Sequence, residues 1–150
     1  MKRFHRYFLY AVLALLFFSG AAWAWFNYFL TAEDVAAAKA WAMKIHGAAA
    51  MATLVLIGTI LTAHVRFAWR AKRNRGNGVL FLSTFGILTI TGYGLYYAGG
   101  ERLRAWTSWI HLGVGLAVPI LLIVHIWLGK RTRAPSRASK IPPLAVENRA

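Results

Sequence analysis

Apolar residues gather into four long runs along the chain, with short polar segments between them. The runs cover about residues 7–30, 41–65, 79–98 and 106–128. As a helix, each run is long enough to cross a bilayer's hydrocarbon core of about 30 Å. The pattern predicts an all-α fold, an integral membrane four-helix bundle with an up-and-down course.

The segments around these runs predict where the helices begin and where the chain turns. Thr31 is a candidate N-cap, and Glu33 and Asp34 would lie in the first helical turn. The second helix is therefore expected to begin before its apolar run and continue into it. Residues 70–78 are basic and contain glycine, and residues 99–102 are short and glycine-rich, so both are predicted to be turns.

The first run also has features of a secretory signal peptide. It follows a basic start, and Ala22-Trp23-Ala24 stands in a cleavage-like position. Apolar residues nevertheless continue to Leu30, which extends the run to spanning length. We therefore interpret it as a retained first helix.

Basic residues are distributed unevenly between the two ends of the runs. Of the 18 Lys and Arg residues, 14 precede the first run, separate the second from the third, or follow the fourth. The positive-inside rule then places both termini and the middle connection in the cytoplasm, as in a bacterial inner-membrane protein. The net charge of +14 is accounted for by topology and contact with anionic membrane lipid, with no need for nucleic acid.

Composition narrows the chemistry further. The chain is 59% hydrophobic and has no cysteine, which excludes disulfides, thiolate metal sites and covalent c-type haem attachment. Residues 1–130 are expected to form one membrane domain. Residues 131–150 are basic and proline-containing, and are predicted to be a disordered cytoplasmic tail.

The fourth run contains two histidines and no other ionisable residue between its ends. His111 and His125 are 14 residues apart, about 21 Å along a helix, and point in similar directions. Ionisable side chains within lipid are costly and usually face the bundle interior, where they need a partner. Between them, Pro119 lacks the amide that would bond to the Gly115 carbonyl, so a bend is expected there.

The remaining histidines suggest partners at two levels. His46 and His64 are 18 residues apart on the second helix, which runs in the same direction as the fourth. His46 is therefore expected opposite His111 on the periplasmic side. On the cytoplasmic side, His125 has two candidate partners: helical angle favours His64, whereas depth relative to the tryptophan belts favours His5, to which we lean.

Histidine-only sites indicate which metal they would hold. Imidazole pairs without Cys, Asp or Glu fit the iron of non-covalently bound b-type haem, of which two are expected. A zinc site would need more protein ligands at one level of the bundle. A cation transporter would typically have acidic residues within its spans, and these spans contain none. Lys44, Arg66 and Arg102 are candidate partners of the haem propionates, although lipid-headgroup anchoring explains each equally well.

Three segments resemble the di-haem cytochrome b membrane subunits of bacterial formate dehydrogenases and nickel–iron hydrogenases, and related small four-helix cytochromes b. They are Arg3-Phe-His5-Arg-Tyr-Phe with Ser19-Gly20, Ile45-His46-Gly47, and the pair His111 and His125. The resemblance implies His46 with His111 on a periplasmic haem and His5 with His125 on a cytoplasmic one. It covers three of the four helices, departs at Arg6, where an aromatic residue is usual, and gives His64 no role.

The haem interpretation leads to an expected function. Two b-type haems would carry electrons across the membrane between the quinone pool and a periplasmic cytochrome or oxidoreductase subunit. The chain would act alone or as the membrane-anchor subunit of an oxidoreductase, because it has no flavin, nicotinamide or iron–sulfur motif. Two other classes stay open: a cofactor-free scaffold or assembly subunit, and a histidine-lined cation transporter.

Separate His5→Ala and His64→Ala variants test the cytoplasmic pairing. We expect His5→Ala to lose one of two haems, because its depth matches that of His125, and His64→Ala to keep both. Haem per chain, measured by pyridine haemochrome assay, provides the readout. Loss in His64→Ala alone would assign His64 instead.

Overall fold

The computed structural model describes residues 3–61, 65–70 and 75–131, and this part of the chain is helical apart from short connections. The helices are α1 (Arg3–Phe29), α2 (Ala32–Ile60), α3 (Arg66–Arg70), α4 (Arg75–Tyr97) and α5 (Glu101–Arg131). The four long helices are each long and apolar enough to cross a membrane. The prediction of an all-α protein with four candidate spans is therefore confirmed, and the chain is a multi-pass membrane protein by these criteria.

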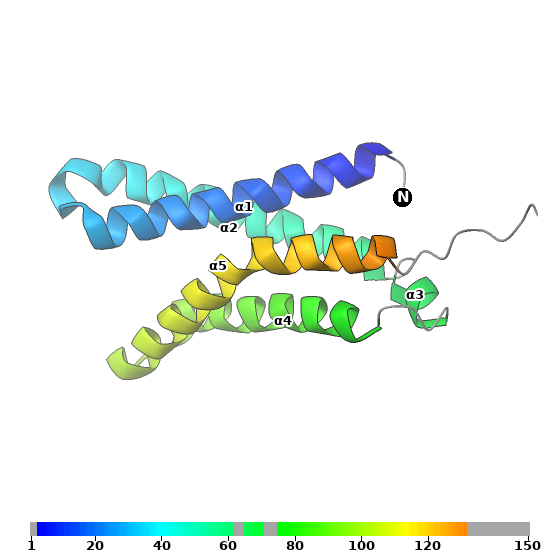
Figure 1. Ribbon diagram of the computed structural model, residues 1–150. Helices are drawn as coiled ribbons and strands as arrows, with labels where there is room; N and C mark the ends of the chain where they lie inside the picture. The colour runs from blue at the N-terminus through cyan, green and yellow to red at the C-terminus, as the bar shows by residue number, and fades with distance from the viewer. Residues whose placement is uncertain (1–2, 62–64, 71–74, 132–150) are drawn as a thin grey trace, which may run out of the picture.

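The long helices pack as two hairpins (Figure 1). α1 lies against α2, α4 lies against α5, and a smaller contact joins α1 to α5. Successive long helices run in opposite directions, so the start of α1 and the end of α5 lie toward the same end of the molecule, near α3. The hairpins thus present α1 and α5 to each other.

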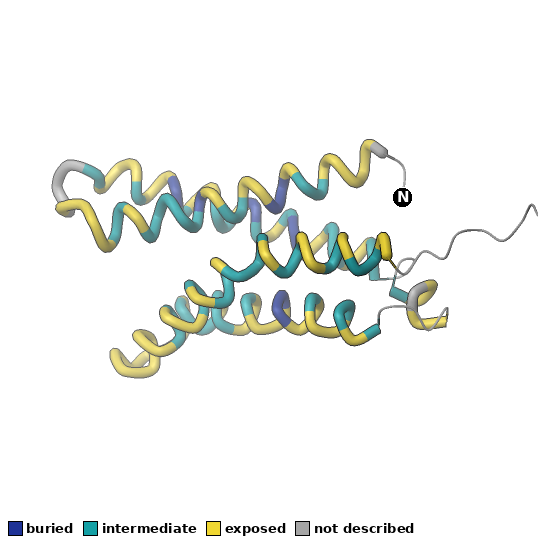
Figure 2. Tube along the Cα trace, viewed as in Figure 1, coloured by how far each residue is buried: buried dark blue, intermediate teal, exposed yellow. Residues whose placement is uncertain are grey.

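Few of the described residues are buried, as the small amount of dark blue in Figure 2 shows. Large apolar side chains are exposed: Phe18 is 67% exposed, Ile90 73% and Ile123 67%. Such a surface would be a liability in water, but lipid tails solvate it as well as a protein core would. The burial pattern agrees with helices that meet hydrocarbon around most of their circumference.

Small residues line the contact between α1 and α2. Ala42 is 7% exposed, Ala49 3% and Thr53 2%. The Thr53 hydroxyl donates to the Ala49 carbonyl oxygen at 2.8 Å, which satisfies it inside its own helix. Because these side chains are short, the two helix backbones approach closely, as small residues allow in membrane helix pairs.

The predicted start of the second helix is confirmed, and two turns differ from the prediction. Thr31 is the N-cap of α2 in an extended conformation, although its side chain makes no capping hydrogen bond. α4 already begins at Arg75 and α5 at Glu101, so residues 75–78 and 101–102 are helical rather than turns. Helical hydrogen bonding satisfies backbone groups near the membrane, which outweighs the helix-breaking tendency of glycine in these segments.

The bend expected in the last span is present. Pro119 lies inside α5, and Figure 1 shows that helix changing direction part-way along its length. The predicted tail lies almost entirely outside the described residues, as does His64.

The close α1–α2 contact predicts a position-specific sensitivity to side-chain size. Ala49→Leu should lower the free energy of unfolding by about 1–3 kcal/mol, because Ala49 is buried and the larger leucine side chain would overpack the contact. Chemical unfolding in detergent micelles measures this. Ala48→Leu, at the neighbouring exposed position, is the matched control and should change stability by less than about 0.5 kcal/mol. Equal stability of both variants would contradict the packing described.

Candidate functional site

Two histidines from different hairpins meet in the middle of the molecule. The rings of His46, on α2, and His111, on α5, have centroids 6.2 Å apart and planes at 80° to each other. Both side chains are partly buried. The structure therefore brings together the two residues that the sequence places at the same level.

The His46 ring is held by α1. Its Nδ1–H donates to the backbone carbonyl oxygen of Leu16 at 2.9 Å, and Ser19 Oγ lies 3.4 Å from the same nitrogen. The Ser19 hydroxyl itself donates to the Leu15 carbonyl oxygen at 2.7 Å. Because a carbonyl oxygen can only accept, Nδ1 carries the hydrogen and Nε2 has the lone pair.

The His111 ring is held in the same way by α4. Thr91 Oγ1 lies 2.9 Å from His111 Nδ1, and the Thr91 hydroxyl donates to the Ile87 carbonyl oxygen at 2.7 Å. A hydroxyl has one hydrogen, so at His111 the Thr91 oxygen accepts and Nδ1–H donates. Nε2 is again the nitrogen with the lone pair, which is the form of histidine that binds a metal.

Two glycines let the imidazoles lie directly against neighbouring backbones. A Cβ added at Gly20 would stand 2.8 Å from His46 Cε1, and one added at Gly92 would stand 3.4 Å from His111 Cε1. Gly20 follows by four residues Leu16, whose carbonyl oxygen accepts from His46, and Gly92 directly follows Thr91, whose hydroxyl oxygen contacts His111. Because Gly20 and Gly92 have no side chain, each ring can lie directly against the backbone of α1 or α4.

The second histidine of α5 also contacts α4. His125 Nδ1 lies 3.1 Å from Asn77 Nδ2, and its ring stacks on Phe81 with centroids 4.9 Å apart and an interplanar angle of 23°. Phe81 in turn packs edge-on against Phe85. The ring plane of His125 is therefore fixed from the α4 side.

The cytoplasmic partner of His125 stays a prediction. His5 is exposed and lies edge-on to Phe4, with centroids 6.0 Å apart, and within the described part of the chain no ring contact joins it to His125. His64 lies outside the described residues. The structure therefore leaves both sequence-based candidates in place.

The basic residues assigned to propionates occupy positions open to the surroundings. Lys44 Nζ lies 4.8 Å from the centre of the Trp41 ring, a cation–π contact. Arg66 begins α3, and Arg102 is in the first turn of α5; both are exposed. Their role toward propionates stays a prediction.

The geometry of the upper pair suits a metal that needs only two protein ligands. With metal–nitrogen bonds of about 2 Å, two imidazoles on opposite sides of one iron have centroids about 6 Å apart. Within residues 3–61, 65–70 and 75–131, no group of three or more His, Cys, Asp or Glu side chains is placed to hold an ion. A porphyrin supplies four nitrogens of its own and needs only two ligands from the protein, so His46 and His111 are the residues that would hold a haem here.

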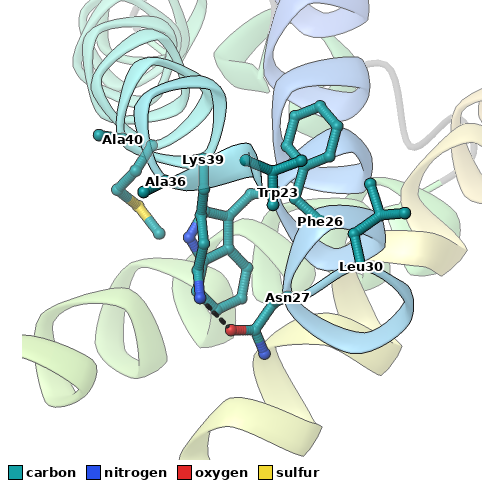
Figure 3. A pocket seen from close by; sticks show the side chains of 9 residues that line it. Trp23, Phe26, Asn27, Leu30, Ala36, Lys39 and Ala40 are labelled. Carbon is teal, nitrogen blue, oxygen red and sulfur yellow. Dashed lines mark hydrogen bonds between the residues drawn. The ribbon is translucent and has the colours of Figure 1, made fainter. Parts of the chain in front are cut away.

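A hollow of about 420 Å³ lies between the end of α1 and the start of α2 (Figure 3). Lys39 Nζ donates to Asn27 Oδ1 at 2.5 Å and lies 5.5 Å from the centre of the Trp23 ring. Met43, in its lining, precedes His46 by about one helical turn on α2. Its lining consists of Trp23, Phe26, Asn27, Leu30, Val35, Ala36, Lys39, Ala40 and Met43.

Apart from Ser19 and Gly20, which the sequence resemblance includes and which lie against His46, the sequence did not single out the residues that orient the rings. Leu16 contributes only its backbone, and Thr91 and Gly92 resemble the small residues common in membrane helices. Asn77 stood within a segment predicted to be a turn. One pattern in the sequence could have identified two of them. Asn77 and Thr91 are polar residues 14 positions apart, the same separation as His111 and His125.

The glycine contact at His46 can be tested directly. Gly20→Ala should displace the His46 ring, because the new Cβ would overlap Cε1, and should cost about 1–3 kcal/mol of stability. Shifted ring signals of His46 in [15N]histidine-labelled protein in micelles would report the displacement. Gly47→Ala is the control, since a Cβ there meets nothing within 4 Å. Unchanged His46 signals in Gly20→Ala would contradict the contact.

Comparisons with protein-family models, curated protein sequences and solved structures find no match. What is established about this chain is therefore its helical fold with four candidate membrane spans and a pair of oriented histidines between two hairpins.

Proposed function

We propose that the protein is a b-type membrane cytochrome that carries electrons across a bacterial inner membrane through two haems. The observation that carries this proposal is the pair His46 and His111. Their rings are 6.2 Å apart, and hydrogen bonds to other helices leave Nε2 as the metal-binding nitrogen in both. In the part of the chain that the structure describes, no cluster of three or more His, Cys, Asp or Glu side chains is placed to hold an ion, which favours iron in a porphyrin over a bare ion.

The chain's contribution is orientation and exclusion of water. His46 and His111 would be the axial ligands of the first haem, which supplies a one-electron iron couple when bound. Gly20 and Gly92 let the rings lie against α1 and α4, and the Nδ1 hydrogen bonds fix their rotation. The apolar helices keep the site away from bulk water.

The second haem is assigned to His125, with His5 or His64 as its other ligand. His125 follows His111 by 14 residues on the same helix, about 21 Å of helical rise. Two tiers at that separation would cover most of the hydrocarbon thickness. The charge distribution supports an up-and-down bundle with both termini in the cytoplasm, which places the His46–His111 tier on the periplasmic side.

A quinone is the proposed partner within the membrane. The hollow between α1 and α2 combines aromatic and aliphatic walls with the Lys39 amine, which can donate to a quinone carbonyl oxygen. Its lining residue Met43 is about one helical turn from His46 on α2, on the side where the upper tier is proposed. A periplasmic cytochrome or another subunit of an oxidoreductase is the proposed second partner.

Haem content of the purified protein tests the proposal. Dithionite reduction should give a b-type absorption band, and pyridine haemochrome assay should give two haems per chain. His46→Ala and His111→Ala should each reduce this to one, because a haem held by one protein ligand is lost easily. Thr59→Ala, an exposed position on α2, is the control and should retain two.

Two results would contradict the proposal. A colourless protein, purified intact from membranes of haem-replete cells, would favour a cofactor-free scaffold. Two haems retained in both His46→Ala and His111→Ala would refute the upper ligand pair.

A further inference from the structure

Helix α4 presents a polar side chain to each histidine of α5. Thr91 Oγ1 lies 2.9 Å from His111 Nδ1, and the Asn77 amide lies 3.1 Å from His125 Nδ1. Asn77 and Thr91 are 14 residues apart, as are His111 and His125. Since α4 and α5 are antiparallel neighbours, a polar side chain of α4 meets the Nδ1 atom of an α5 histidine at two levels about 21 Å apart, through an oxygen at Thr91 and through Nδ2 at Asn77.

We propose that Asn77 and Thr91 are positioning residues that keep both α5 histidines in the form with hydrogen on Nδ1 and the lone pair on Nε2. This inference rests on the proposed function, because it concerns how the chain prepares His111 and His125 as iron ligands. It assigns α4, which contributes no histidine, a role at both haems.

At Thr91 the direction of the hydrogen bond follows from the partners of the hydroxyl. The hydroxyl hydrogen points to backbone carbonyls of its own helix, Ile87 at 2.7 Å and Leu88 at 3.3 Å. Toward His111 the Thr91 oxygen can then only accept. A hydroxyl held by its own helix is a fixed acceptor, which suits an orienting role.

At Asn77 the amide nitrogen Nδ2 is the atom that lies 3.1 Å from His125 Nδ1, and the direction inferred here requires the amide to be turned over. A side-chain amide presents its Nδ2 donor or its Oδ1 acceptor to the same point by turning over. With Oδ1 toward His125, the ring donates from Nδ1 and keeps its lone pair on Nε2, as His111 does. Phe81, stacked on the His125 ring at 4.9 Å, holds the ring plane while Asn77 sets the position of the hydrogen.

The arrangement extends to the third oriented histidine. His46 donates from Nδ1 to the Leu16 carbonyl of α1, so each ring is oriented by a helix other than its own. An acceptor on Nδ1–H makes an imidazole a stronger electron donor to a metal. Removing the acceptor should therefore weaken haem retention and raise the midpoint potential of that haem.

Thr91 is tested by substitutions that separate its hydroxyl from its shape. Thr91→Val keeps the shape and should weaken retention of the His46–His111 haem by about 10-fold or more, within the 10- to 100-fold range for such partners. The midpoint potential of that haem should rise in a redox titration while the other stays unchanged. Thr91→Ser should restore both properties.

The matched control is Thr89→Val on the same helix. Among the described residues, the hydrogen bond of the Thr89 hydroxyl goes to the Phe85 carbonyl in its own helix, so this variant should behave as wild type. A Thr91→Val protein with unchanged haem retention and potential would overturn the role of Thr91. A change of equal size in Thr89→Val would also overturn it, because the effect would then be one of helix structure.

Asn77 is tested with a variant that can only accept. Asn77→Asp should keep the His125 haem and lower its midpoint potential, because an ionised carboxylate is a stronger acceptor. Asn77→Leu should lose that haem. If Asn77→Asp loses the haem as Asn77→Leu does, Asn77 acts as a donor and the proposal fails at this site.

A second measurement separates this inference from the proposed function. The 15N signals of [15N]histidine-labelled protein in micelles report which ring nitrogen carries hydrogen, with or without haem. Wild type should show Nδ1–H at His111, and Thr91→Val should shift it toward a mixture of the two forms. If wild type binds no haem but Thr91→Val still shows the shift, the cytochrome function alone is refuted. If wild type binds haem but Thr91→Val shows no shift, the positioning role alone is refuted.

Discussion

The structure depends on one constraint: an imidazole ring placed among apolar helices must have partners for both nitrogens. A buried polar group without a partner costs about 1–3 kcal/mol, and the cost rises in a medium of low dielectric constant. His46 and His111 meet this constraint at Nδ1 by binding a neighbouring helix, α1 and α4 respectively. Each bond lies within a hairpin, so the same contacts that orient the rings also join α1 to α2 and α4 to α5. The nitrogen that each ring leaves for a further partner is Nε2, and the two rings lie edge-on to each other between the hairpins, with centroids 6.2 Å apart.

The rest of the fold is suited to keeping these polar contacts in place without a conventional core. Lipid solvates the outer surface, so hydrophobic burial gives the helices little reason to associate. The helices associate instead through close contacts. These contacts involve the buried small residues Ala42, Ala49 and Thr53 and the backbone exposed at Gly20 and Gly92. The small residues that let the helices approach therefore also give the histidines access to backbone oxygens.

The hairpins meet through α1, α5 and the histidine pair, and this arrangement bears on the proposed function. A haem held by His46 and His111 would join α2 of one hairpin to α5 of the other through its iron. Cofactor binding and association of the two hairpins would then be linked, as for other metal sites whose ligands come together only in the folded chain. The bend at Pro119 separates the level of His111 from that of His125, so each tier can meet its own surroundings.

The sequence alone determined the four spans, the start of α2, the bend in α5 and the pairing of His46 with His111. These features follow from local hydropathy, from the missing proline amide and from helical rise, none of which depends on how the helices pack. Tertiary structure decided what holds each ring: the Leu16 carbonyl, Thr91 and Gly92, and Asn77 beside His125. A backbone carbonyl leaves no mark in the sequence, and a threonine in a membrane helix usually bonds to its own backbone, so only the packing of α1 on α2 and of α4 on α5 makes these groups partners of the histidines.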